Sequence, residues 1–287
     1  MRGCVLVIGA TGMLGHPVAA RLLADGFAVR VLARDPDKAS RMLGEGYDVV
    51  RGDVEDADAL RAALTGADGV HVSLKAGPKP GEPERVEHQG TARTARLAKE
   101  SGVQRITYLS GCFVDARHAR ESEAEAAKWG AEQAIESSGV PYTILKPTYF
   151  METLPLHVQG KVAVVLGKQP HRWHMVAARD YAGMVSSAHS GPSGANARQF
   201  VFGPEPLTMV EALKRYCDAA EGGKRVVTAP LPVMKTLNAT VMRGELNREL
   251  ALMRVMQREG EPAPPAADGE LQRGTTTLDQ WLAERRG

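Results

Sequence analysis

The segment Val5–Gly15, with the sequence VLVIGATGMLG, constrains the fold of this chain more than any other stretch. Its four leading apolar residues are typical of a buried β-strand, and glycines follow at positions 9, 12 and 15. An apolar helical pattern begins directly afterwards and includes Val18 and Leu22. A strand, a glycine turn and a helix in this order form the first half of a βαβ unit. The segment therefore predicts a dinucleotide-binding site.

Each glycine of this turn has a separate expected role. One lets the backbone turn, one lets a diphosphate approach the main chain, and one lets the helix pack closely on the strand. The start of the helix offers unpaired N–H groups and a positive dipole end to the phosphates. An ordinary glycine-rich turn is the alternative, but the position between a strand and a helix favours binding. The residues predicted to hold the diphosphate are Gly9, Thr11, Gly12, Met13, Leu14 and Gly15.

The composition is that of an ordinary globular protein. The chain has 287 residues, of which 43% are hydrophobic, and a formal net charge of +2. No strongly basic run points to nucleic acid, and no apolar run approaches the roughly 20 residues of a membrane span. Three widely spaced cysteines fit reduced thiols better than a disulfide framework. We expect a cytoplasmic protein, monomeric or homodimeric, whose partner is a small-molecule substrate rather than nucleic acid or a membrane.

Strand patterns alternate with helical patterns over the first half of the chain. The predicted strands are Val5–Ile8, Ala28–Ala33, Tyr47–Arg51, Gly69–Ser73, Ile106–Ser110 and Tyr142–Leu145. The predicted helices are Leu14–Ala24, Pro36–Leu43, Ala57–Leu64, Glu84–Glu100 and Glu121–Ser137. The alternation predicts an α/β fold, a Rossmann-type doubly wound parallel sheet over residues 1–147. We expect a small α/β substrate-binding subdomain over 148–287, from which a segment near 178–203 returns to the sheet.

Ligands of such sheets bind at the carboxyl ends of the strands, so the residues directly after each strand are candidates. Arg34 follows the second strand, where an arginine suits the 2′-phosphate of NADP(H) and an acid suits the ribose of NAD(H). Asp35 is expected to cap the next helix, and Lys38 is a possible second cation. NADP(H) is therefore favoured, with NAD(H) as the alternative. The further cofactor-binding candidates at strand ends are Asp53, Val54, Ser73, Leu74, Lys75 and Ser110.

In these residues and in several later segments, the chain resembles the atypical short-chain dehydrogenase/reductase superfamily, and within it the NmrA-like NAD(P)-binding family. The resemblance rests on the glycine motif, on Arg34, on Gly52-Asp53-Val54 and on Lys128 with Glu132. It extends to the segments 108–111, 141–152, 178–182 and 202–208, and so covers most of the chain. It implies the fold and a nicotinamide cofactor. It leaves the reaction open, because the branch includes reductases, isomerases and cofactor-sensing proteins.

The resemblance also implies catalytic residues. The superfamily's usual mechanism uses a Ser or Thr and a Tyr-x-x-x-Lys turn, in which the lysine lowers the tyrosine's pKa and holds the nicotinamide ribose. Here Ala124 stands four residues before Lys128, so Lys128 is carried over as a ribose ligand and the usual proton donor is missing. A surface lysine paired with Glu132 at i+4 is the alternative reading. The candidate proton donors are Lys128 itself, Tyr149, His118 and a bound water, and Ser110 is the candidate for the catalytic hydroxyl.

The residues after the sixth strand are expected to face the nicotinamide and the substrate, by the same resemblance. They are Pro147, Thr148, Tyr149 and Phe150. The predicted substrate pocket adds Cys112, Phe113, Met151, His157, Trp173 and Met175, and Cys112 competes with Ser110 for the usual hydroxyl position. The pair His171 and His174 lacks a matching acid or cysteine set, so no metal is expected.

The last third of the chain shows a looser pattern. We predict strands at Val162–Leu166, Gln199–Gly203 and Val226–Leu231. The predicted helices begin near Ala178 and cover Leu207–Ala219, Val233–Arg243, Leu246–Arg258 and Thr277–Arg285, with a linker at Glu259–Asp268.

Three functions are compatible with these residues. The favoured one is an NADP(H)-dependent oxidoreductase that acts on a small carbonyl, enone or quinone-like substrate. A non-catalytic NADP(H) sensor is the first alternative, because Ala124 replaces the proton-donating tyrosine. An isomerase, epimerase or cyclase on the same scaffold is the second.

Overall fold

The computed structural model describes residues 2–191, 196–263 and 271–285 of the chain. The chain separates into two compact units. The first comprises Met1–Lys146 and Ala178–Gln199, and the second comprises Pro147–Ala177, Phe200–Ala267 and Leu271–Gly287.

An eight-stranded sheet has the strand order β14-β11-β6-β5-β4-β1-β2-β3. Its strands are β1 Arg2–Ile8, β2 Phe27–Ala33, β3 Tyr47–Arg51, β4 Gly69–Val72, β5 Arg105–Leu109, β6 Tyr142–Pro147, β11 Ala197–Phe202 and β14 Leu271–Arg273. The neighbours from β3 through β6 pair in parallel, as do β11 and β14. The order β3-β2-β1-β4-β5-β6 is that of a doubly wound dinucleotide-binding sheet, so the predicted fold class is confirmed.

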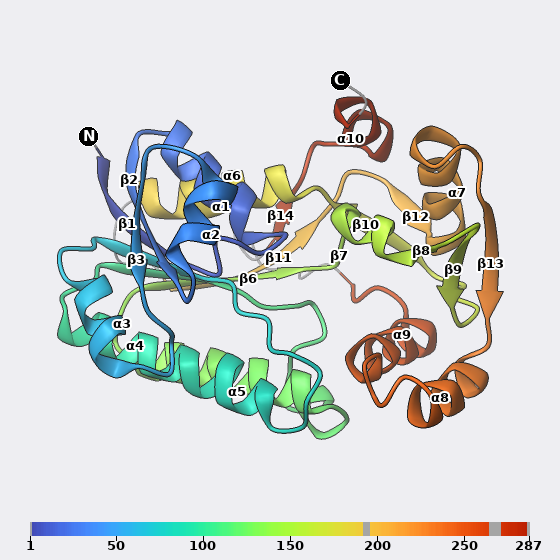
Figure 1. Cartoon of the computed structure of the whole chain (residues 1–287), viewed down its shortest axis with the longest axis horizontal. Helices are drawn as coiled ribbons and strands as arrows, with labels where there is room; N and C mark the ends of the chain where they lie inside the picture. The colour runs from blue at the N-terminus through green and yellow to red at the C-terminus, as the bar shows by residue number, and fades with distance from the viewer. Residues whose placement is uncertain (1, 192–195, 264–270, 286–287) are drawn as a thin grey trace. The chain divides into compact units, whose positions relative to one another are not determined.

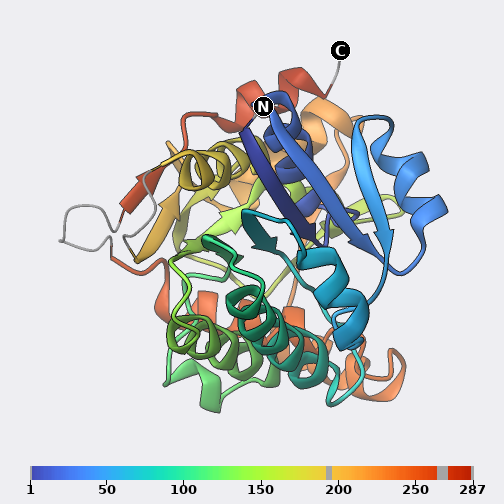
Figure 2. The same ribbon diagram turned by 90° about the vertical axis from the view of Figure 1, so that its left-hand side faces the viewer.

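Helices cover both faces of this sheet (Figures 1 and 2). One face carries α1 Gly15–Ala24, α2 Pro36–Leu43 and α6 Ala178–Ser190, of which α1 packs against α6. The other face carries α3 Ala57–Leu64, α4 Gly90–Glu100 and α5 Glu123–Ser137. An apolar cluster lies between the strands and this second layer, because the inward faces of both are aliphatic. Its members include Leu6, Val70, Ile106, Ile144, Leu60, Leu97 and Ile135.

An irregular turn adjoins two of the predicted helices of the first unit and changes their boundaries. The expected helix Glu84–Glu100 is divided into a π-helix, η1, at Pro83–Gln89 and the helix α4. The expected helix Glu121–Ser137 begins at Glu123 and follows a short 3₁₀ turn, η2, at His118–Arg120. Apolar periodicity does not distinguish a π-turn from an α-turn over so few residues, so the sequence pattern merges them.

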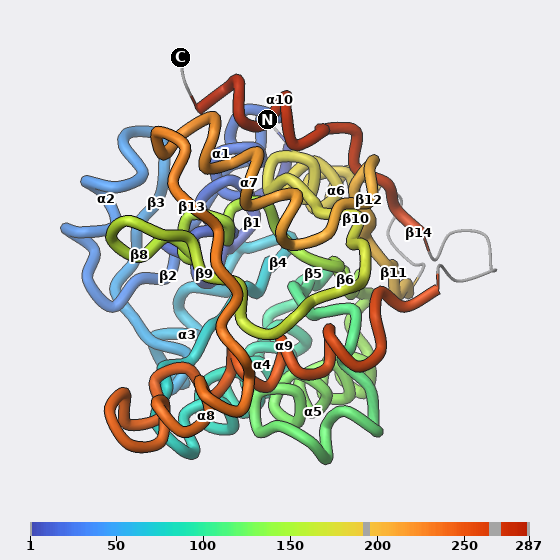
Figure 3. The backbone as a smooth tube through the Cα atoms, turned by 90° about the vertical axis from the view of Figure 1, so that its right-hand side faces the viewer, coloured from blue at the N-terminus to red at the C-terminus, as the bar shows by residue number. Residues whose placement is uncertain are grey.

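The second unit contains two three-stranded sheets, β12-β10-β7 and β13-β9-β8 (Figure 3). Their strands are β7 Tyr149–Phe150, β8 Val158–Gln159, β9 Val162–Leu166, β10 Arg172–Val176, β12 Pro206–Thr208 and β13 Arg225–Ala229. The helices are η3 Met151–His157, a 3₁₀ segment, and α7 Met209–Ala220, α8 Leu231–Thr240, α9 Asn247–Glu259 and α10 Leu278–Glu284. Capping boxes at Thr208 and Thr277 fix the starts of α7 and α10.

Several strands were missed by the sequence prediction, namely β7, β8, β10, β12 and β14. They have two to five residues, too few for an alternating pattern to stand out. The predicted strand Val226–Leu231 ends two residues earlier, since Leu231 begins α8. Residues 264–268 of the predicted linker lie outside the described residues.

Within the described residues, no helix has both the length and the apolar character needed to span a membrane.

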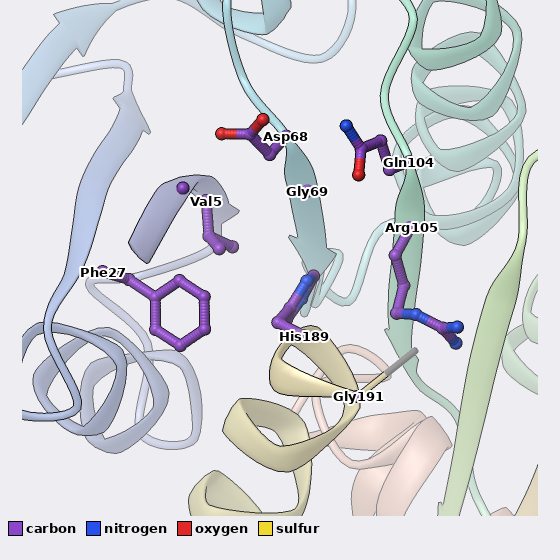
Figure 4. Close-up of a pocket in the computed structure, with 9 residues that line it drawn as sticks. Val5, Phe27, Asp68, Gly69, Gln104, Arg105, His189 and Gly191 are labelled. Carbon is purple, nitrogen blue, oxygen red and sulfur yellow. The ribbon is translucent and has the colours of Figure 1, made fainter. Parts of the chain in front are cut away.

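A pocket of about 180 Å³ lies at the amino ends of β1, β4 and β5, the opposite edge of the sheet from the glycine turn (Figure 4). His189, from the end of α6, lies against Gly69, where an added Cβ would lie 2.5 Å from its Nδ1. Parallel register sets His71 beside Thr107, and the Thr107 hydroxyl lies 2.9 Å from His71 Nδ1 and 2.9 Å from His189 Nε2. Burial lowers the pKa of both histidines to about 3, and Arg105 contributes to the shift at His189.

This buried histidine pair predicts an acid-labile fold. Both rings stay neutral in the folded state, whereas in the unfolded chain they take up protons once the pH falls below about 6.5. Folding stability is therefore complete above that pH and is lost as the pH falls toward 3. We expect a loss of about 2 kcal/mol for each histidine between pH 7 and pH 5, measured by urea unfolding. His71→Leu is expected to reduce this loss by about 2 kcal/mol, and His16→Leu, at an exposed residue, to leave it unchanged. Equal stability at pH 7 and pH 5 contradicts the prediction.

Candidate functional site

The glycine turn between β1 and α1 is packed so closely that side chains do not fit at two of its positions. Gly9 has φ +91°, and a Cβ there would lie 2.2 Å from the Ser73 carbonyl oxygen. A Cβ on Gly15 would lie 2.1 Å from the Gly9 carbonyl oxygen. At Gly12 the nearest atom, the same Gly9 oxygen, would be 3.2 Å away. Gly9 and Gly15 therefore serve the fold, whereas Gly12 leaves an accessible stretch of main chain.

The first turn of α1 is suited to an anion. Leu14 is the N-cap residue and offers no side-chain hydrogen bond to the helix. Thr11, Gly12 and Met13 are exposed directly before it. The N–H groups at the start of a helix need partners from outside, and the helix dipole makes negatively charged ones favourable. The turn thus fits the diphosphate of a dinucleotide.

Arg34 lies at the carboxyl end of β2 with its side chain 86% exposed. Its guanidinium is 3.8 Å from the Asp53 carboxylate, at the end of β3, so two of the predicted cofactor residues lie together. Asp35 caps α2 by accepting from the Lys38 N–H at 3.0 Å, which confirms its predicted role. The Lys38 side chain is exposed on the first turn of α2.

Arg51 is a cation at this edge that the sequence analysis missed. The register of β2 and β3 places it opposite Ala33, and its Nη1 donates to the Arg34 carbonyl oxygen at 3.2 Å. Its place as the last residue of the predicted third strand was the available signal. The sequence-based candidates were the residues that follow each strand, so Arg51, which is the last residue of a strand, was not among them.

The remaining candidates around β4 differ in access. Ser73 lies against Gly9, and its N–H donates to the Ile8 carbonyl oxygen. Leu74 is half-buried and Lys75 is exposed. Val54 is buried, and its carbonyl oxygen accepts from Arg93 at 2.5 Å. Val54 is thus held by α4 and offers little surface to a ligand.

Ser110 and Glu132 belong to a buried charged cluster. Ser110, directly after β5, donates its hydroxyl proton to the Glu132 carboxylate. Lys146 donates to the same carboxylate at 2.9 Å and to the Val114 carbonyl oxygen at 2.6 Å. Arg198 lies 3.6 Å from Glu132. In this arrangement the Ser110 proton is directed at a buried acid.

Lys128 is largely buried, with its side chain 12% exposed. Its ammonium donates to the Leu109 carbonyl oxygen at 3.2 Å, at the carboxyl end of β5, and lies 5.6 Å from the centre of the Tyr108 ring. Glu87 from η1 is an acidic partner, with its Oε2 at 3.7 Å from Nζ. The alternative of a surface lysine paired with Glu132 is therefore wrong, because Glu132 is fully buried and pairs with Lys146.

The predicted pocket residues on the loop after β5 are buried. Cys112 and Phe113 are each less than a tenth exposed, and the Phe113 ring lies 5.4 Å from that of His118. Ala124 is also buried, so the position of the expected tyrosine is filled by a methyl group inside the protein.

Tyr149 and His157 form a hydrogen-bonded pair inside the second unit. The Tyr149 hydroxyl lies 2.9 Å from His157 Nε2, and His157 Nδ1 lies 2.9 Å from the Val164 carbonyl oxygen. A carbonyl accepts, so Nδ1 carries the proton and Nε2 accepts from Tyr149. Burial raises the pKa of Tyr149 to about 12 and lowers the pKa of His157. Such a phenol keeps its proton firmly.

The other candidates of the second unit are buried within it. Phe150 pairs with Val176 and Tyr149 with Met175 in the parallel β7–β10 ladder. Thr148 donates its hydroxyl to the His174 carbonyl oxygen at 2.5 Å. The fully or nearly fully buried members are Pro147, Met151, Trp173 and Met175.

Taken by itself, the first unit is a dinucleotide-binding domain, since its glycine turn, exposed cations and buried lysine all lie at the carboxyl ends of parallel strands. The model of the NAD(P)H-binding family matches residues 9–190. The chain therefore belongs to this NAD(P)H-binding family of atypical short-chain dehydrogenases/reductases, as its sequence motifs predicted.

Curated relatives agree with this assignment. The chain is 34% identical to the (4-alkanoyl-5-oxo-2,5-dihydrofuran-3-yl)methyl phosphate reductase of Streptomyces griseus over 72% of this chain and 70% of the relative. It is 29% identical to the NAD(P)H azoreductase of Xenophilus azovorans over 80% of this chain and 79% of the relative.

Solved structures share the fold at lower sequence identity. The NADPH-dependent quinone oxidoreductase of Escherichia coli, complexed with NADPH, has a TM-score of 0.74 at 20% identity, with 99% of this chain and 100% of that chain covered. The triphenylmethane reductase of Citrobacter sp., complexed with NADP(H), has a TM-score of 0.73 at 20% identity, with 98% of this chain and 99% of that chain covered.

Proposed function

We propose that this protein is an NADPH-dependent reductase that acts on a small carbonyl, enone or quinone-like substrate. The observation that carries the proposal is the position of Lys128: a buried ammonium at the carboxyl end of β5, in the same unit and at the same strand edge as the glycine turn. A reductase needs both a dinucleotide site and a proton source. The relatives that support this reading are named as reductases of a furanone phosphate and of azo compounds.

In this proposal, different residues of the chain bind the cofactor and donate the proton. NADPH, when bound, supplies the hydride, and the residues of the glycine turn hold its diphosphate. Lys128 donates a proton from Nζ to the substrate atom that gains negative charge as the hydride arrives, so the substrate gains one hydride and one proton in all. Lys128 fits this role better than Tyr149, whose pKa near 12 opposes proton release. It also fits better than Ser110, which donates to Glu132.

The test is a turnover assay of the purified protein with NADPH. A panel of quinones, enones, aldehydes, azo dyes and 2,5-dihydrofuranones is expected to contain at least one compound that is reduced, with one NADP⁺ formed for each hydride transferred. The assay follows NADPH absorbance and identifies the product by mass spectrometry. The absence of turnover across the panel, together with tight NADPH binding, would favour the cofactor sensor, for which the buried Ala124 is the supporting observation.

The preference for NADPH over NADH follows from cations at the carboxyl edge of β2 and β3. Arg34 is exposed, and Arg51 donates to its carbonyl oxygen. Two arginines therefore lie at the carboxyl ends of the neighbouring strands β2 and β3. A 2′-phosphate there would accept charge-assisted hydrogen bonds, each worth about 1.5–3 kcal/mol.

Arg34→Ala is therefore expected to raise the dissociation constant for NADPH by about tenfold or more and to leave that for NADH nearly unchanged. Arg51→Ala is expected to act in the same direction. Arg41→Ala, at an exposed arginine in the last turn of α2, is the control for a lost surface charge. Titration calorimetry with both cofactors measures the difference, and equal losses for NADPH and NADH in the Arg34 variant count against the assignment.

A further inference from the structure

Glu87 is a buried acid that the sequence analysis did not single out and that the proposed reaction does not use directly. Its side chain is 1% exposed. It lies on η1, the π-helix at Pro83–Gln89, and irregular turns of this kind recur at functional sites. A buried carboxylate is costly unless hydrogen bonds and an opposite charge compensate it, so its contacts show what holds it there.

Glu87 connects two parts of the candidate site. Its Oε1 accepts from the Ala76 N–H at 2.8 Å, on the segment that follows β4 and the candidate cofactor residues Ser73, Leu74 and Lys75. Its Oε2 lies 3.7 Å from Lys128 Nζ. One carboxylate thus contacts both the cofactor-side segment after β4 and the ammonium at the end of β5.

We propose that Glu87 is the positioning residue of Lys128: its buried carboxylate keeps the lysine charged and directed at the carboxyl end of β5. This inference rests on the proposed function for its effect on turnover, though not for its effect on the lysine itself. Ionisable groups that face Lys128 from neighbouring elements include Glu87 on η1 and Tyr108 on β5. The first carries a negative charge and stabilises the ammonium. The second presents the face of its ring, which also favours a cation.

The Glu87 carboxylate therefore favours the protonated form of Lys128. An opposite charge within about 4–6 Å favours the charged form of an ionisable group, and burial otherwise disfavours it. Without Glu87, Lys128 would be a buried ammonium with less compensation, so more of it would be the neutral amine. A neutral amine reacts with acylating reagents and has no proton to donate.

The first test measures the lysine and needs no turnover. The protein with NADPH bound is treated briefly with acetic anhydride, and acetylation of Lys128 is quantified by peptide mass spectrometry. Glu87→Gln, which keeps an acceptor for the Ala76 N–H and removes the charge, is expected to raise the rate at Lys128 by about tenfold. Glu84→Gln, at a partly exposed acid on the same helix that pairs with His88, is the matched control and is expected to change nothing.

The second test measures turnover. Glu87→Gln is expected to lower kcat by about tenfold or more while the dissociation constant for NADPH stays within about threefold. In a Lys128→Met background the same change is expected to alter kcat by less than about twofold, because the two residues act as one unit. A purely structural role for Glu87 would give additive losses and a parallel loss of NADPH binding.

The outcomes separate this inference from the proposed function. Faster acetylation of Lys128 in the Glu87 variant, with no substrate reduced by the wild type, supports the pairing and overturns the reductase. Normal turnover with unchanged acetylation in a folded Glu87→Gln protein overturns the positioning role. Should that variant not fold, Glu87→Asp retains the charge and shortens the side chain by one methylene group. An unchanged acetylation rate and kcat in this variant would equally overturn the proposal.

Discussion

Gly9→Ala is expected to abolish NADPH binding and to destabilise the first unit. Gly9 has φ +91°, a conformation that costs a residue with a Cβ about 1 kcal/mol or more. Its new Cβ would also lie 2.2 Å from the Ser73 carbonyl oxygen, and this main-chain atom, directly after β4, has little freedom to move away because the Ser73 N–H is bonded to Ile8. The turn would have to open between β1 and β4, where the diphosphate is expected to bind. We expect an affinity loss of about 100-fold or more, measured by titration calorimetry.

Two further glycine variants separate strain from binding. Gly26 also has a positive φ, +87°, but a Cβ there meets no atom of the described residues within 4 Å. Gly26→Ala should therefore cost only the conformational strain, seen in thermal unfolding, and should bind NADPH normally. Gly12→Ala should fold, because its nearest contact would be 3.2 Å, and should lose about tenfold or more in NADPH affinity by blocking the main chain. Normal binding by a folded Gly12→Ala protein would place the diphosphate elsewhere.

Lys128→Met is expected to lower kcat by about 10²–10⁴-fold, the range typical of a lost general acid. The methionine preserves most of the buried volume but has no proton to give. Lys128→Arg should be almost as slow, because a guanidinium stays protonated through the accessible pH range. NADPH affinity should fall far less than kcat, since the glycine turn and the arginines supply most of the contacts in this proposal.

The comparison requires a substrate that the wild type reduces and a control for the loss of a lysine. Lys214→Met, at an exposed position on α7, should leave kcat unchanged. Stopped-flow measurement of a single turnover separates hydride transfer from product release. A Lys128→Met protein that keeps more than about a tenth of the wild-type kcat would assign the proton to another group.

The sequence was a sufficient guide to the six parallel strands from β1 to β6 and to the glycine turn. The end of the strand around Leu6 is a continuous apolar run, as expected for a parallel strand buried on both faces, and the alternation of strands with helices predicted the doubly wound sheet. Asp35 was predicted to be the cap of α2 because Asp-Pro is a local signal, and the structure confirms it.

The sequence did not predict the partners of the buried charges. Lys128 and Glu132 are four residues apart, which suggested an ion pair along the helix, but Glu132 turns to Lys146 and Lys128 turns to Glu87, 41 residues earlier in the chain. Helical spacing predicts which side chains lie on the same face of a helix. It does not predict which charged groups from other elements are buried against that face.

The amino-acid sequence alone determined the α/β class, the doubly wound parallel sheet and the glycine turn, because these depend on local periodicity and on residues whose backbone needs are local. The tertiary structure decided which acid meets Lys128, how Arg51 joins Arg34, and that Ser110 faces a carboxylate. These contacts connect residues far apart in the chain. Where a charged group is buried, only a partner of suitable charge or hydrogen-bonding capacity can stabilise it. A charge removed from water must find an opposite charge or a hydrogen bond within a few ångströms, and only the folded chain fixes which group that is.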